Sequence, residues 1–139
     1  DYFFESSESF DELVANGDLL EWTNYGGHRY GTPRAQVDEA LRLGEHIFLD
    51  IENDGASQVK AARADAVLVF VLPPSLAELE KRLRRRGDTS EADIDKRLTV
   101  AAQQIEDARD RYNWLITNDD LDLALLQLRR ILAAAERNS

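Results

Sequence analysis

The feature that most constrains the fold is an uninterrupted apolar run at residues 66–72, followed directly by Pro73 and Pro74. Strands with one face in water alternate between apolar and polar residues, whereas a continuous run is typical of a parallel strand buried on both faces. Helical patterns lie on both sides of this run, so strands alternate with helices along the chain. The sequence therefore predicts an α/β fold with a parallel sheet.

Periodicity and stop signals predict the other elements. Shorter extended segments are expected at residues 19–23, 46–51 and 114–117, and the Gly-rich, aromatic stretch at 25–32 suits a hairpin. Helices are expected at residues 7–14, 33–43, 55–62, 75–86, 90–111 and 121–137. Ligands of parallel sheets bind at the carboxyl ends of strands, which directs attention to Asp50, Ser75 and Asn118.

Composition excludes several classes of function. The 139 residues suit one domain, and a net charge of −10 argues against a general binder of nucleic acids or anionic membranes. No cysteine and only two histidines exclude thiolate catalysis and Cys- or His-rich metal sites. No apolar run approaches the roughly 20 residues of a membrane span, and the first residues do not resemble a secretory signal peptide.

The charge is unevenly distributed along the chain. Residues 81–97 hold seven of the 17 cations against four acids, so this segment carries +3 and the remainder −13. A basic segment in an acidic protein suggests a local anionic ligand, although a solvated helix face is the alternative. Arg82 and Arg86 share a helix face, and with Arg97 they could form a clamp for phosphates. They could equally be exposed arginines paired with acids such as Glu78 and Asp93.

Three side chains near the expected hairpin could read a planar base. A carboxylate such as Glu21 can accept two N–H donors at once, and guanine offers such a pair at N1 and its exocyclic amino group. Tyr30 and Thr32 share a face if their segment is extended, and their hydroxyls can bond to a phosphate or a base. A solvated Glu21 and a half-buried, packing Tyr30 are the alternatives.

In combination, these segments resemble the guanylate kinase family, which transfers the γ-phosphate of ATP to GMP. The resemblance extends over almost the whole chain, and its strength is the order and spacing of individually weak motifs. The motifs are Asp1-Tyr2-Phe3-Phe4, Leu20-Glu21-Trp22, Tyr30-Gly31-Thr32-Pro33, residues 49–55, Pro73-Pro74-Ser75 with Leu79, Arg82-Leu83, Arg86-Gly87, Lys96-Arg97-Leu98 and Asn118-Asp119-Asp120-Leu121.

The resemblance implies a role for each matched residue. Tyr2 and Tyr30 match tyrosines that hold the GMP phosphate, whereas Glu21, Thr32 and Asp50 match residues that read guanine. Glu52 falls where the family usually has Asp, near the metal and phosphates, and is grouped with the GMP-binding residues. Arg82, Arg86 and Arg97 match the catalytic arginines that close over the phosphates, and Asn118 matches the position beside the ATP adenine.

The resemblance also implies an architecture: a three-layer, parallel-sheet P-loop kinase fold with a small GMP-binding subdomain and a helical lid. In one domain over residues 1–139, it places the GMP-binding subdomain at about 1–43, the core at about 44–83 and 98–139, and the lid at about 84–97. It further implies ATP and GMP or dGMP as ligands, Mg²⁺ carried by the nucleotide phosphates, no metal held by the protein alone, and a cytoplasmic location.

Three features depart from the family pattern. Asp54 stands where the family usually has Gln, Arg29 stands where a small or polar residue is usual, and no G-x-x-x-x-G-K-[S/T] motif occurs in the 139 residues. We therefore expect an amino-terminally incomplete guanylate-kinase-like chain, without the first strand and P-loop, that is inactive alone. The alternative is a kinase-like module without enzymatic activity that binds phosphopeptides or proteins at the former GMP site.

Overall fold

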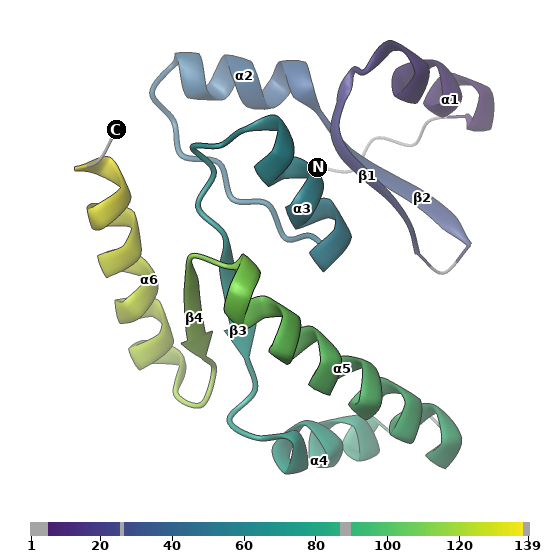
Figure 1. Ribbon diagram of the computed structural model, residues 1–139, viewed down its shortest axis with the longest axis vertical. Helices are drawn as coiled ribbons and strands as arrows, with labels where there is room; N and C mark the ends of the chain where they lie inside the picture. Colours follow the sequence, from purple (N-terminus) through teal and green to yellow (C-terminus); the bar gives the residue numbers. More distant parts are fainter. Residues whose placement is uncertain (1–5, 26, 87–89, 138–139) are drawn as a thin grey trace. The chain divides into compact units, whose positions relative to one another are not determined.

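The computed structural model describes residues 6–25, 27–86 and 90–137 (Figure 1). The chain divides into two compact units, Asp1–Ala66 and Val67–Ser139.

The first unit combines a β-hairpin with three helices. Its elements are α1 (Ser7–Asn16), β1 (Leu19–Tyr25), β2 (His28–Pro33), α2 (Arg34–Arg42) and α3 (Asn53–Ala62). The Ser6 hydroxyl accepts a hydrogen bond from the Ser9 amide at the start of α1, and Gly17 ends this helix with a φ of 73°. A left-handed residue after a helix favours glycine, so the predicted start and stop of α1 are confirmed.

The hairpin has an irregular register at the start of β1, where three consecutive residues, Leu19, Leu20 and Glu21, are buried. Leu19 lies opposite Pro33, but Glu21 lies opposite Thr32, so Leu20 is an extra residue in β1. Such a β-bulge changes where side chains point. Leu20 packs in a core with Val37 of α2 and Val59 of α3, and Glu21 is also buried. Three partly buried residues pack against this core: Leu49, Ile51 and Ala66.

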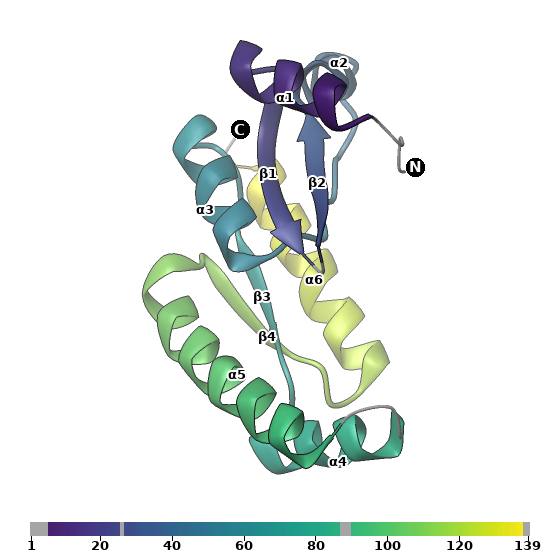
Figure 2. The ribbon, with the colours of Figure 1, turned by 90° about the vertical axis from the view of Figure 1, so that its right-hand side faces the viewer.

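The second unit contains the parallel strands. Its elements are β3 (Val69–Leu72), α4 (Leu76–Arg86), α5 (Glu91–Arg111), β4 (Trp114–Thr117) and α6 (Leu121–Glu136). β3 pairs in parallel with β4, with Val69 opposite Trp114 and Leu72 opposite Thr117. Figures 1 and 2 show α5 and α6 on opposite sides of this strand pair. The predicted α/β class is therefore confirmed.

Two predictions about strands are wrong. Residues 46–51 run without regular secondary structure between α2 and α3, and the apolar run becomes a strand only at Val69–Leu72. Val71 is 58% exposed, so this strand is not buried on both faces. Within the described residues β3 pairs only with β4, and no segment pairs with residues 46–51. An apolar pattern indicates which side chains favour burial, but a strand also needs a neighbour for its backbone hydrogen bonds.

In the three stretches that the structure covers, no helix combines the length and the apolar character that crossing a bilayer requires.

The core position of Leu20 predicts a large effect of truncation. Leu20→Ala should lower the free energy of unfolding by about 2–5 kcal/mol, because Leu20 is 4% exposed and removing its methyl groups creates a cavity in the core. Urea unfolding measures this through the fluorescence of Trp22, in a Trp114→Phe background. Leu43→Ala is the control, since Leu43 is 60% exposed and should change stability by less than about 0.5 kcal/mol. Equal losses in both variants would contradict the assigned core.

Candidate functional site

The first unit buries one carboxylate beside a hydroxyl. Glu21 is 4% exposed, and its Oε1 accepts a hydrogen bond of 2.6 Å from the Thr32 hydroxyl. The two residues lie opposite each other in the hairpin. A buried carboxylate is costly unless donors surround it, so this pairing gives Glu21 part of the environment that it needs. The structure thus brings together two of the predicted guanine-reading residues.

Tyr30 lies on the same face of the hairpin. It pairs with Thr23, two residues after Glu21, and stands two residues before Thr32 on β2. Residues two apart on a strand point to one side, so Tyr30 and Thr32 share a face, as predicted from their spacing, and the register adds Glu21 to that face. Tyr30 is 40% exposed, so its ring is not enclosed by packing.

The other predicted GMP-binding residues that the structure describes do not lie on the hairpin. Asp50 and Glu52 are exposed and lie in the irregular segment before α3. Glu52 occupies the N-cap position of α3, but its side chain makes no capping hydrogen bond. Tyr2 lies outside the described residues. Across residues 6–25, 27–86 and 90–137, no group of three or more His, Cys, Asp or Glu side chains could hold a metal ion.

Helix α3 contacts β1 through two residues whose role sequence reasoning missed. Gly55 is buried, and a Cβ built on it would lie 2.7 Å from Oε2 of Glu21. The Gln58 amide donates to the Trp22 carbonyl at 2.9 Å and accepts from the Trp22 N–H at 3.1 Å. A glycine inside a helix costs about 1 kcal/mol relative to alanine. Gly55 within a predicted helix was therefore a sequence signal that another group lies close to the helix backbone.

Two departures from the family pattern receive a structural explanation. Asp54 accepts a hydrogen bond of 3.0 Å from Nε2 of Gln58, so it orients the amide that holds Trp22. Arg29 joins β2 to α1: it pairs with the Asp11 carboxylate, donates to the Ser7 carbonyl at 2.7 Å and lies 4.6 Å from the Phe10 ring centroid. Both residues therefore support the hairpin and its surroundings.

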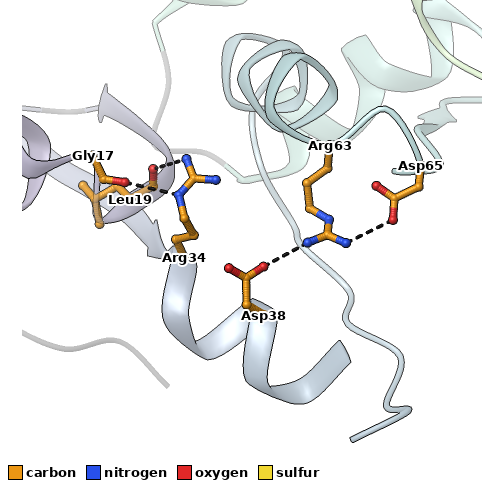
Figure 3. Close-up of polar contacts among 6 residues, drawn as sticks. All are labelled: Gly17, Leu19, Arg34, Asp38, Arg63 and Asp65. Carbon is orange, nitrogen blue, oxygen red and sulfur yellow. Dashed lines mark hydrogen bonds and ion pairs between the residues drawn. The ribbon is translucent and has the colours of Figure 1, made fainter. Parts of the chain in front are cut away.

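Helix α2, which begins directly after Thr32 and Pro33, is fixed by two arginines (Figure 3). Arg34 donates to the carbonyls of Gly17 at 3.2 Å and Leu19 at 3.4 Å, which ties α2 to the start of β1. Arg63, after α3, donates to Asp38 of α2 at 2.9 Å and to Asp65 at 3.1 Å. The hydrogen bond from Arg63 holds the pKa of Asp65 below its ordinary value, and burial opposes this slightly.

The second unit brings one predicted arginine to the predicted adenine position. Arg82 lies on α4 and its Nη2 is 3.5 Å from the carbonyl oxygen of Asn118, which follows β4. Its Nε is 3.6 Å from Oε1 of Glu78. Both contacts are long, and the Arg82 side chain is 41% exposed. Its guanidinium is therefore accessible to an anion.

The rest of the basic segment is partly neutralised by acids. Arg84 pairs with Glu80 at 2.9 Å and with the Glu91 carboxylate, and these hydrogen bonds, the one to Glu91 first, raise the pKa of Arg84. Arg85 lies 3.8 Å from Glu78. The alternative of a solvated, ion-paired face is thus observed for these two arginines. Arg97 is exposed on α5, and the side chain of Arg86, the last residue of α4, lies outside the described part.

Comparisons with known proteins place this chain in one family. A model of the guanylate kinase family matches residues 1–135. Among the relatives, guanylate kinases of Parasynechococcus marenigrum (strain WH8102) and Bacillus anthracis are 45% and 43% identical over 94% and 95% of this chain. These matches cover 71% and 64% of the two relatives.

Structural comparison agrees with the sequence comparison. The crystal structure of guanylate kinase from Anaplasma phagocytophilum aligns with a TM-score of 0.74 and 30% identity, over 96% of this chain and 64% of that one. The chain thus spans about two thirds of the length of the proteins it matches.

The ion pairs of Arg63 predict a pH-dependent contribution to stability. Because the pKa of Asp65 is lowered on folding, the contribution is full above the unfolded Asp pKa of about 3.9 and is lost as the pH falls through the folded value. Arg63→Met should destabilise the chain at pH 7 by about 0.2–1 kcal/mol, a range that allows for the 70% exposure of Asp65. Urea unfolding should show the difference from the wild type shrinking as the pH falls below about 3.9.

Arg109→Met is the control for this prediction, because Arg109 is exposed on α5 and forms no ion pair with any residue that the structure describes. A difference between Arg63→Met and the wild type that persists unchanged at low pH would show that the ion pairs are not its source.

Proposed function

Because this chain belongs to the guanylate kinase family, we propose that the protein transfers the γ-phosphate of ATP to GMP or dGMP and produces the corresponding diphosphate. The observation that carries the proposal is the buried Glu21 carboxylate with its hydrogen bond from Thr32. Both residues occupy positions at which the family reads guanine. GMP, ATP and a cytoplasmic location are part of the same proposal.

The chemistry of Glu21 suits guanine and opposes adenine. The N1–H and the 2-amino group of guanine can donate two hydrogen bonds to one carboxylate, and bonds to a charged acceptor are the stronger kind. Adenine presents an acceptor at N1, which would face the negative charge. Thr32, already bonded to Oε1, holds the carboxylate in place before the base arrives. This arrangement supports selection of guanine through the ring edge.

The phosphates would be held by the remaining matched residues. Tyr2 and Tyr30 are proposed for the phosphate of GMP, with Asp50 assisting at guanine and Glu52 near the phosphates. Arg82, Arg86 and Arg97 would neutralise the charge of the transferring phosphoryl group, and Asn118 would lie beside adenine. Phosphoryl transfer depends chiefly on such positioning and charge stabilisation, which an accessible guanidinium like that of Arg82 can provide.

Magnesium enters the proposal only with the nucleotide. Within the described ranges no cluster of carboxylates forms a cage for the ion, so Mg²⁺ would be carried by the phosphates of ATP. When bound, it would neutralise phosphate charge. The guanylate-kinase-like binding module remains the alternative function, and its ligand would be a phosphopeptide at the same hairpin face.

The missing phosphate-binding motif predicts how activity depends on chain content. The 139 residues contain no G-x-x-x-x-G-K-[S/T] motif, so this chain alone should release no ADP in a coupled assay with ATP and GMP. A chimera in which the P-loop segment of a guanylate kinase relative precedes residue 1 should be active. Activity of the short chain would contradict the role given to the motif. An inactive, folded chimera that binds a phosphopeptide tightly would favour the module.

The guanine-reading role predicts a selective effect of removing the carboxylate. In the active chimera, Glu21→Ala should raise the KM for GMP about tenfold or more and leave the KM for ATP nearly unchanged, because charge-assisted hydrogen bonds to the base are lost. Glu12→Ala is the matched control, since Glu12 is an exposed acid on α1 in the same unit. If both variants retain the wild-type KM for GMP, the assignment of Glu21 is wrong.

A further inference from the structure

The contacts between α3 and β1 have a consequence for the carboxylate of Glu21. Gln58 bonds to both backbone polar groups of Trp22, the residue that follows Glu21 in β1. A side-chain amide here takes the place of a neighbouring strand, because it supplies one donor and one acceptor to the strand edge. Asp54, four residues earlier on α3, accepts the second amide hydrogen and so fixes which way the amide faces. The backbone next to Glu21 is therefore fixed by α3.

The carboxylate itself approaches α3 where that helix has no side chain. A Cβ on Gly55 would lie 2.7 Å from Oε2 and 3.4 Å from Cδ of Glu21, with Cβ of Ile51 at 3.5 Å. Two non-bonded heavy atoms at 2.7 Å repel each other strongly, so a side chain at position 55 would displace the carboxylate. Glycine has a cost inside a helix, and neither a turn nor a positive φ at Gly55 accounts for it. The close approach of Glu21 does.

The β-bulge at Leu20 directs Glu21 toward this position. In a regular strand, consecutive side chains point to opposite faces, so Leu20 and Glu21 would not both face α3. The extra residue allows Leu20 to enter the core with Val59 of α3 while Glu21 is also buried, between Thr32 and Gly55. Three constraints thus act on the Glu21 side chain: the hydrogen bond to Oε1, the steric limit at Oε2 and the fixed backbone of the next residue, Trp22.

We propose that Gly55 and Gln58 are positioning residues that determine base specificity, because they set how deeply the Glu21 carboxylate lies and so align both its oxygens with a purine edge that offers two N–H donors. This inference rests on the proposed function, in which Glu21 reads guanine. Neither residue needs to touch the ligand. Discrimination between purines then depends on Gly55 of α3 having no side chain.

The test compares two ligands that differ by one donor. GMP has both the N1–H and the 2-amino group, whereas IMP keeps the N1–H and has no amino group. Displacement of the carboxylate should weaken GMP binding more than IMP binding, because two aligned hydrogen bonds are disturbed with GMP and only one with IMP. The ratio of the two dissociation constants therefore reports alignment, and a general loss of stability would weaken both ligands alike.

The experiment titrates the 139-residue chain, labelled with ¹⁵N, with GMP and with IMP and follows the backbone amide resonances, which also report whether each variant is folded. Gly55→Ala should weaken GMP binding about tenfold and lower the preference for GMP over IMP at least about threefold. Gln58→Met keeps a similar side-chain volume and should lower the same preference. Ser57→Ala, an exposed position on α3, is the control and should leave the preference unchanged.

Each outcome separates the positioning role from the proposed function. If Glu21→Ala abolishes the preference but folded Gly55→Ala and Gln58→Met keep it, the positioning role is wrong and the guanine-reading role stands. If Gly55→Ala does not fold, the ratio of the GMP and IMP dissociation constants measured for Gln58→Met decides whether the positioning role is right. If the wild-type chain binds GMP no more tightly than IMP, or if Glu21→Ala changes nothing, both the positioning role and the guanine-reading role fail.

Discussion

The first unit depends on holding one carboxylate, that of Glu21, away from water. A buried charge is unfavourable unless donors surround it, and the Thr32 hydroxyl at 2.6 Å is the donor that the hairpin supplies. The bulge at Leu20 and the glycine at position 55 make room for the carboxylate between β2 and α3. The hairpin, α2 and α3 are then joined by the core of Leu20, Val37 and Val59. The same residues that build the core therefore also position the side chain that is proposed to read a base.

The second unit manages charge in a different way. Its cations lie on exposed helices and are shared among acids: the Glu78 carboxylate is within 4 Å of Lys81, Arg82 and Arg85, while Arg84 bonds to both Glu80 and Glu91. Exposed pairs of this kind contribute little stability and exchange partners easily. An incoming phosphate can therefore compete for Arg82 at small cost. The net charge of −10 on the whole chain argues against binding of a long polyanion, and it is compatible with a local site for a nucleotide.

Local signals in the sequence predicted much of the fold, and long-range partners decided the rest. The helix that Ser6 begins and Gly17 ends depends on chemistry within a few residues, so it was predictable, as was the hairpin that pairs Glu21 with Thr32. The segment 46–51 carries a strand-like apolar pattern, but its state depends on whether another strand pairs with it. Gly55 and Gln58 act across more than 30 residues of sequence on β1, and no local pattern specifies that contact. The motifs that resemble guanylate kinases located Glu21 and Thr32 and included Gly55 in residues 49–55, but they gave Gly55 no role and did not reach Gln58.

In the proposed function, the Glu21 carboxylate accepts hydrogen bonds from guanine. The most direct measurement is the ¹³Cδ resonance of Glu21 in chain labelled with ¹³C-glutamate, assigned by its loss in Glu21→Gln, during titration with GMP and with AMP. We expect a saturable change of this resonance with GMP and none with AMP at the same concentrations. A resonance that responds equally to both nucleotides, or that stays fixed while amide resonances of β2 shift on GMP binding, would contradict this role of Glu21.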